Sequence, residues 1–185
     1  TYDAWDYGCS IVVDKLPLLK KEQFDFSDFA QIVARLRAPD GCPWDREQTH
    51  ESLRGSLIEE CYEVVDAIDA NDPHMLSDEL GDLLLQVVIH AQIAKDHSEF
   101  DAIDVCSQIA KKMIRRHPHV FADVEADTAG EVLGNWEQIK RVEKEQRTLA
   151  EAVRDVPRSA GMLLQAQKMQ RKAARFGFDW ADYTG

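Results

Sequence analysis

Cysteine is scarce in this sequence, and the four that occur among 185 residues form no Cys-x-x-Cys pair: Cys9, Cys42, Cys61 and Cys106. Such wide spacing argues against a disulfide framework and a structural zinc site, and it is typical of unpaired thiols in a reducing compartment. Long apolar runs are missing too, because none approaches the roughly 20 residues that span a bilayer. No signal peptide is visible, so we expect a cytoplasmic protein.

Basic residues are also in short supply. Lys and Arg number 22 against 34 Asp and Glu, which gives a formal net charge of −12. A surface this acidic repels DNA, RNA and anionic lipid, so we expect neither a nucleic acid nor a membrane as a partner. A small phosphorylated ligand is compatible with this charge if a divalent cation and a local basic cluster receive it.

Strand-like alternation is nearly absent, whereas apolar residues recur at spacings of three and four, as in amphipathic helices. Short links between such helices favour antiparallel packing, so the predicted fold class is an all-α, antiparallel helical bundle. Residues 38–45 are predicted to be a turn, and Asp45 or Thr49 is predicted to cap the helix that follows. Caps and prolines delimit six predicted helices: residues 27–37, 47–70, 73–96, 101–117, 128–147 and 159–175.

Acidic residues gather on the second of these helices. At about 100° per residue, Glu59, Glu60 and Glu63 form a strip that borders the apolar stripe of this helix. We therefore expect the strip at the rim of the core rather than in bulk solvent.

The third helix is apolar on nearly every side, which predicts that it is buried. Yet Glu79 and Asp82 lie on one of its faces, and Gln86 and His90 continue that face. An uncompensated buried carboxylate costs about several kcal/mol. No Lys or Arg occurs between residues 55 and 93 to neutralise the acidic groups. A hard divalent cation does so, because Mg²⁺ prefers oxygen ligands.

Two alternatives compete with this metal site. Single Glu-x-x-Glu spacings are common on solvated helices, but the joint pattern on two helices is much more specific. A ferritin-like di-iron site needs Glu-x-x-His on two helices. The only match is Glu47-x-x-His50, away from the acidic strip, so iron chemistry is disfavoured.

A basic cluster ends the fourth predicted helix, with Lys111, Lys112, Arg115 and Arg116 inside six residues. Lys112 and Arg116 share a face of the helix, so together they can bind a polyphosphate. The alternative is that these cations only complement the dipole at the C-terminus of the helix.

Several other side chains are candidates with a plainer alternative. Trp136 and Lys140 share a face of the fifth helix, where core packing and a surface charge would explain them equally well. Trp44 is either a lid that stacks on a base or a plug for the end of the bundle. For His117 and His119 a role in the turn and in packing is favoured over a role as ligands.

Five motifs together resemble a MazG domain, and the resemblance is dense from residue 27 to residue 147. They are Asp40-Gly41-Cys42-Pro43-Trp44-Asp45, Glu59-Glu60-x-x-Glu63, Glu79-Leu80-Gly81-Asp82-Leu83-Leu84, Arg115-Arg116-His117-Pro118-His119-Val120-Phe121 and Trp136-Glu137-x-x-Lys140. The resemblance implies a four-helix core that assembles as a homodimer, in which helices from two subunits complete each site.

The resemblance also implies a cofactor and a reaction. Mg²⁺, with Mn²⁺ as a substitute, is expected on four carboxylates: Glu60, Glu63, Glu79 and Asp82. The triphosphate and nucleotide are expected near Lys112, Arg116, Trp136 and Lys140. Similar domains hydrolyse NTPs or dNTPs to the monophosphate and pyrophosphate, with broad base tolerance and often in house-cleaning. We therefore expect an enzyme in which Glu59, or else Glu63, orients or deprotonates the attacking water.

The alternative function is a catalytically weak module that binds NTP and Mg²⁺ for regulation or serves dimerisation. The domain boundaries we expect are an N-terminal extension over residues 1–26, a catalytic helical domain over 27–148, and a linker with a partial helix over 149–185. The extension resembles the connector that follows a tetrapyrrole methylase domain in MazG fusions. The last segment resembles the lead-in to a second MazG domain.

Overall fold

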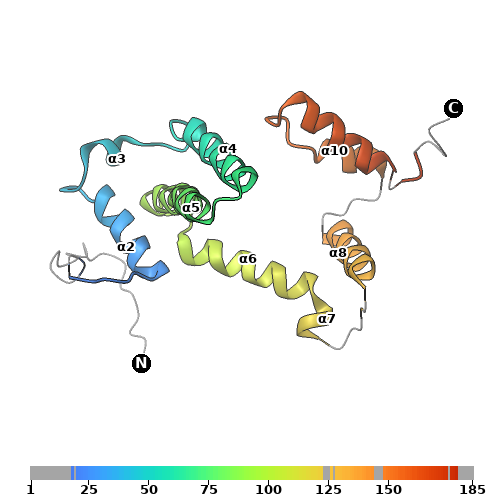
Figure 1. The fold of residues 1–185 in the computed structure, drawn as a ribbon, viewed down its shortest axis with the longest axis horizontal. Coiled ribbons are helices and arrows are strands. Elements are labelled where there is room, and N and C mark those ends of the chain that lie inside the picture. Colours follow the sequence, from blue (N-terminus) through green and yellow to red (C-terminus); the bar gives the residue numbers. More distant parts are fainter. Residues whose placement is uncertain are drawn as a thin grey trace. The chain divides into compact units, whose positions relative to one another are not determined.

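The computed structural model describes residues 18, 20–122, 126, 128–143, 148–174 and 176–178. Every regular element in those ranges is a helix, which confirms the predicted all-α class (Figure 1). In chain order the helices are α2 (Phe26–Arg37), α3 (Pro43–Glu47), α4 (Arg54–Ala70), α5 (Pro73–Asp96), α6 (Ala102–Arg116), α7 (Pro118–Phe121), α8 (Ala129–Glu143), α9 (Leu149–Arg154) and α10 (Met162–Ala174). The chain divides into two compact units, Thr1–Ile109 and Ala110–Gly185, and each is described by itself.

Local capping explains where the predicted helices begin. The side chain of Asp72 accepts hydrogen bonds from the backbone amides of His74 and Met75, at 2.9 and 3.2 Å, and Pro73 occupies the first turn. Thr128 and Glu131 form the predicted capping box of α8, with both bonds at 3.3 Å. These contacts satisfy amide groups that have no partner inside the helix.

The second predicted helix starts later than expected. The sequence predicts a helix from residue 47, capped by Asp45 or Thr49, but α4 begins at Arg54 and its N-cap residue is Leu53. Thr49 does cap a turn, because its amide donates to Ser52 Oγ at 3.0 Å and the Ser52 amide donates to Thr49 Oγ1 at 3.2 Å. This turn does not continue into α4 as regular α-helix, because the Arg54 amide donates to the carbonyl of Glu51, only three residues earlier, at 3.3 Å.

The sequence did not predict three short helices, α3, α7 and α9. Helix α3 falls in the segment expected to be a turn, where Pro43 starts one turn of helix. Helix α9 has a capping box between Thr148 and Glu151, a Thr-x-x-Glu pattern that the sequence displays. The predicted ends at residues 147 and 175, most of the extension over residues 1–26 (1–17 and 19), and residues 179–185 lie outside the described residues.

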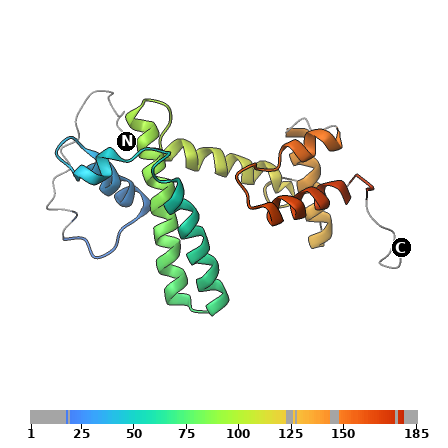
Figure 2. The ribbon, with the colours of Figure 1, turned by 90° about the horizontal axis from the view of Figure 1, so that it is seen from above.

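The first unit is built on an antiparallel pair, α4 and α5, which run side by side (Figure 2). The chain reverses at Asn71, whose φ of 54° is left-handed. Helix α2 packs against the C-terminal half of α5. The core formed there has five buried members: Val33, Leu53, Val88, Ile89 and Ile93.

Helix α5 is not buried along its whole length, so that expectation was wrong. Leu80, Leu84 and Val87 are 48%, 39% and 42% exposed, although the C-terminal half of the helix is buried. The physical reason is that α2 covers only the C-terminal half, which leaves α4 to cover the rest. These three apolar residues are therefore only partly covered within the described part of the first unit.

Arg37 fixes the segment that leads from α2 to α4. Its side chain is 6% exposed, and its Nε donates to Asp96 Oδ2 at 2.8 Å. Its Nη1 donates to the backbone carbonyls of Asp45 and Gln48, at 2.5 and 3.1 Å. One guanidinium thus ties the segment around α3 to the end of α5.

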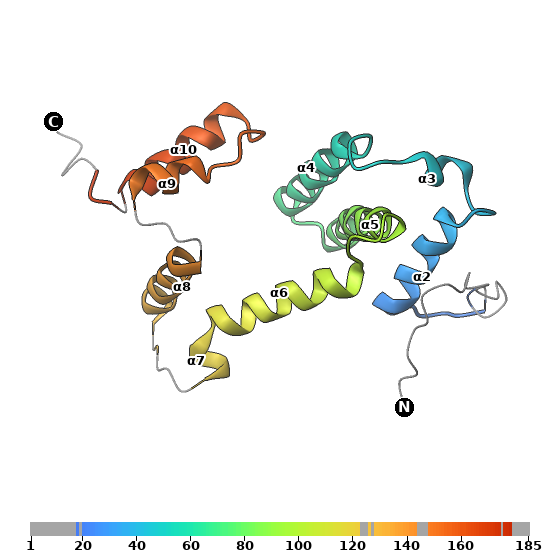
Figure 3. The ribbon, with the colours of Figure 1, turned by 180° about the vertical axis from the view of Figure 1, so that it is seen from behind.

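In the second unit α9 and α10 pack against each other (Figure 3). Ala152 and Val156 are buried there, and Lys172 Nζ donates to the carbonyl of Ala152 at 2.6 Å and to Asp155 Oδ2 at 3.3 Å. Across the described residues of both units, no helix combines the length and the apolar character that crossing a membrane requires.

Candidate functional site

Three of the predicted carboxylates converge between α4 and α5. Glu60, Glu79 and Asp82 each offer an oxygen atom, and these atoms all lie within 4.8 Å of one another. The register of the pair explains the meeting, because Glu60 and Asp82 stand the same number of residues before and after Asn71. In an antiparallel pair such positions lie opposite each other, and Glu79 joins them from the previous turn of α5.

The carboxylates of this group repel one another electrostatically. Burial raises the pKa of Glu60, and the nearby Asp82, Glu63 and Glu79 raise it further. The pKa of Glu79 is raised by burial and then by Glu63, Asp82 and Asp78. Like charges at this spacing repel, and a cation among them would relieve the repulsion. Because all three donors are carboxylate oxygens, the group fits a hard divalent cation.

Glu63 and Glu59 are placed differently. Glu63 is exposed and lies outside the group of three, but its charge contributes to the raised pKa values of both Glu60 and Glu79. Glu59 is exposed as well. The expected position at the rim of the core therefore holds for Glu60, which is partly buried, and is wrong for the other two.

The second unit brings three predicted substrate residues together. The guanidinium carbon of Arg116 lies 5.1 Å from the ring centroid of Trp136, and Lys140 Nζ lies 4.9 Å from the same ring. Both distances suit cation–π contacts. Arg116 is only 8% exposed. Lys112, one turn earlier on α6, is partly buried.

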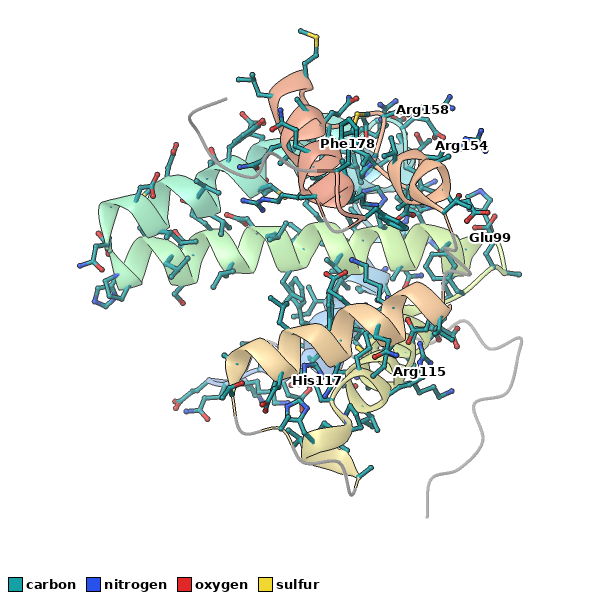
Figure 4. All side chains as sticks on the ribbon, turned by 90° about the vertical axis from the view of Figure 1, so that its right-hand side faces the viewer. Glu99, Arg115, His117, Arg154, Arg158 and Phe178 are labelled. Atoms are coloured by element: carbon teal, nitrogen blue, oxygen red, sulfur yellow. The ribbon has the colours of Figure 1, made fainter. Side chains whose placement is uncertain are left out.

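Glu143 is a member of this cluster that the sequence did not single out. It binds Arg115 through Oε1 at 2.5 Å, and it binds Arg116 through Oε2, at 3.0 Å from Nε and 2.5 Å from Nη2. Hydrogen bonds from Arg116 and then Arg115 lower the pKa of Glu143 to about 2. Arg115 is labelled beside α8 in Figure 4. The spacing Trp136, Lys140, Glu143 on one helix face was the signal available.

The structure bears on three further candidates, His117, His119 and Trp44. His117 precedes α7 as its N-cap residue, and its Nδ1 lies 2.7 Å from the carbonyl of Met113, which fits the turn role. Its ring lies 5.7 Å from that of His119. Trp44 is 61% exposed, which fits a lid better than a plug.

A histidine pair extends the polar face of α5. His50 Nδ1 and His90 Nδ1 lie 2.7 Å apart, with the rings nearly parallel. Gln86 Oε1 and His90 Nε2 are buried and have no hydrogen-bond partner among the described residues. Burial lowers the pKa of His90, and His50 lowers it further.

Comparison with known proteins identifies the region that carries the carboxylates. Residues 48–121 match the family model described as MazG nucleotide pyrophosphohydrolase domain. A relative from Escherichia coli (strain K12), named nucleoside triphosphate pyrophosphohydrolase, is 51% identical over 150 residues, which are 80% of this chain and 57% of the relative. A relative from Thermotoga maritima, named nucleoside triphosphate pyrophosphohydrolase/pyrophosphatase MazG, is 43% identical over 167 residues, 90% of this chain and 64% of the relative.

The chain thus spans less than two thirds of the length of either relative. A crystal structure of a MazG-related protein from Thermotoga maritima resembles this fold with a TM-score of 0.52 and 27% identity. The similarity covers 60% of this chain and 95% of that one. Residues 48–121 are therefore a domain of the MazG family.

Proposed function

We propose that this protein hydrolyses nucleoside triphosphates, NTPs or dNTPs, to the monophosphate and pyrophosphate. The observation that carries the proposal is the convergence of Glu60, Glu79 and Asp82 within the matched MazG domain. The names of both relatives describe the same activity. We further propose broad base tolerance, a house-cleaning role, and residues 27–148 as the catalytic region.

Mg²⁺, with Mn²⁺ as a substitute, is the cofactor we propose. Glu60, Glu79 and Asp82 would hold it, and Glu63 is the fourth proposed ligand. When bound, the ion would neutralise charge on the phosphate oxygens and lower the pKa of a water molecule bound to it. The raised pKa values of Glu60 and Glu79 support a cation at this position, because they reflect a cluster of like charges.

The remaining roles belong to side chains of the chain itself. Glu59 is exposed and outside the group of three, so it is our first choice to orient or deprotonate the water that attacks the α-phosphorus, and Glu63 is the second. Lys112 and Arg116 would hold the β- and γ-phosphates. Trp136 and Lys140 would contact the nucleotide.

A homodimer is proposed from the apolar surface of α4 and α5. Exposed residues recur at spacings of three and four on each helix: Ile58, Tyr62 and Val65 on α4, and Leu80, Leu84 and Val87 on α5. A second copy of the chain would cover these stripes and complete each site. Light scattering should find a dimer, and Leu84→Glu should convert it to a monomer. Met162→Glu, at an exposed position in the second unit, should leave the dimer intact.

The test of the activity is pyrophosphate release from a panel of NTPs and dNTPs with Mg²⁺, with Mn²⁺ and with EDTA. We expect release with either metal and none in EDTA. Glu60→Gln and Asp82→Asn should abolish it, whereas Asp66→Asn, an exposed acid on α4, should leave it unchanged. Full turnover in the first two variants would contradict the proposal.

The same assay separates the alternative function. Saturable binding of NTP and Mg²⁺ without any monophosphate product would support a regulatory module.

We propose that the protein is cytoplasmic, because the described cysteines, Cys42, Cys61 and Cys106, are free thiols that suit a reducing compartment.

A further inference from the structure

We propose that Glu143 is a positioning residue that holds the Arg116 guanidinium against the indole ring of Trp136, in the orientation in which Arg116 binds the phosphates of the substrate. This inference rests on the proposed function, which gives Arg116 its phosphate. It assigns a role to a side chain outside the motifs that carry the family resemblance.

The contacts of Glu143 fix the guanidinium in two ways. Its Oε2 accepts from both Nε and Nη2 of Arg116, which sets the direction of the guanidinium plane. Trp136 lies against the same group, at 5.1 Å from ring centroid to guanidinium carbon. A guanidinium carries five N–H donors. Glu143 accepts hydrogen bonds from two nitrogens of Arg116, Nε and Nη2. The N–H groups of Nη1 can therefore donate to a phosphate.

Glu143 is itself held in place. Arg115 Nε donates to its other oxygen, Oε1, at 2.5 Å, so neither oxygen of the carboxylate is free to turn. Its pKa of about 2 keeps it ionised across the physiological range. A nearly buried guanidinium is costly without a counter-charge, and Glu143 provides one at the face of Trp136.

Preorganisation is the reason that this arrangement matters for function. An arginine side chain loses much rotamer freedom when it binds a ligand, and that loss weakens binding. Arg116 has already lost this freedom in the folded protein, because Glu143 and Trp136 hold it. The substrate then meets a cation already in position.

Two rival readings make different predictions. If the ion pair only joins the end of α6 to α8, its loss lowers stability and leaves substrate affinity unchanged. If Glu143 competes with phosphate for Arg116, its loss strengthens substrate binding. The positioning role instead predicts weaker binding with little change in the chemical step.

The experiment compares kinetics and calorimetric binding of an Mg²⁺–NTP complex across variants of the whole chain. For Glu143→Gln we expect KM to rise about tenfold with kcat nearly unchanged, the order of effect of losing one charge-assisted hydrogen bond. Glu143→Asp, which keeps the charge, should recover part of the loss. Asp155→Asn disrupts another ion pair of the second unit, with Lys172 at 3.3 Å, and should leave KM unchanged.

A double-mutant cycle tests whether Glu143 acts through Arg116. Adding Glu143→Gln to Arg116→Gln should have no further effect on KM or on Kd, because the residue being positioned is already gone. Additive effects, an unchanged KM, or a lower KM in Glu143→Gln would each overturn the inference. If Glu143→Gln does not fold, the comparison rests on Glu143→Asp, which must still show a raised KM.

The two proposals fail in different ways. A wild-type protein that releases no pyrophosphate contradicts the proposed function, and calorimetric binding of the same nucleotide still tests the positioning role. An active wild type whose Glu143 variants bind the nucleotide normally contradicts the positioning role alone.

Discussion

His50 Nδ1 lies 2.7 Å from His90 Nδ1, and this contact joins the turn before α4 to the middle of α5. One Nδ1 must donate its hydrogen and the other must accept it, so the accepting ring is neutral. If both rings were protonated, both Nδ1 atoms would carry a hydrogen and two cations would lie side by side, so the contact depends on at least one neutral ring.

The first prediction concerns the pH dependence of stability. Because the pKa of His90 is lowered in the fold, by burial first and His50 second, the unfolded chain binds more protons as the pH falls through about 6.5. We therefore expect the contribution of the pair to be present at pH 8 and to be lost as the pH falls below roughly 6.5. Thermal unfolding measured from pH 8 to pH 5 checks the sign.

His90→Gln should flatten this dependence, and His74→Gln, at an exposed histidine of α5, is the matched control. The comparison with wild type separates the contribution of His90 from those of Glu60 and Glu79. Their raised pKa values change the stability in the opposite direction as the pH falls. Equal slopes in wild type and His90→Gln would contradict the role of the pair.

The second prediction concerns the carboxylate group without and with metal. Glu79→Gln should raise the melting temperature in EDTA, because the raised pKa of Glu79 reflects burial and repulsion that the neutral amide avoids. In millimolar MgCl₂ the wild type should gain stability by mass action, and the variant should gain little. Asp66→Asn should behave as wild type in both buffers. A variant that responds to Mg²⁺ as fully as wild type would remove Glu79 from the site.

The third prediction compares two arginines of α2. Arg37→Lys should lower the free energy of unfolding by about 2 kcal/mol, because a lysine cannot serve Asp96 and two backbone carbonyls from a nearly buried position. Arg35→Lys should change it by less than about 0.5 kcal/mol, because its partner Asp40 is 77% exposed. Urea unfolding measures both, and equal effects would show that Arg37 is not a structural link.

The fourth prediction concerns two glycines. A Cβ at Gly41 would lie 2.2 Å from the carbonyl oxygen of Leu36 and 2.5 Å from that of Arg35, so the turn after α2 would have to move. We expect Gly41→Ala to cost about 3 kcal/mol of stability. Gly55→Ala, in the first turn of α4 with no atom within 4 Å, should instead stabilise the protein by about 0.5–1 kcal/mol. The same urea experiment decides, and a neutral Gly41→Ala would show that the turn adapts.

The sequence by itself determined the helical class and most helix starts, because caps such as Asp72 act within one turn of chain. It also predicted Glu60, Glu63, Glu79 and Asp82 as candidate ligands, because their spacing on two helices and the absence of Lys and Arg between residues 55 and 93 are visible without coordinates. The sequence placed the start of α4 too early because Thr49 caps only a turn with Ser52, and regular helix begins after that turn, at Arg54.

The tertiary structure alone decided the relationships that depend on contacts between distant segments. The reversal at Asn71 sets the register of α4 and α5, and that register selects Glu60, rather than Glu59 or Glu63, to meet Glu79 and Asp82. Helix α2 covers only part of α5, which decides which of its apolar residues are buried. The contact of Glu143 with Arg116 likewise joins residues far apart in the chain, and no local periodicity encodes which of several acids an arginine will bind.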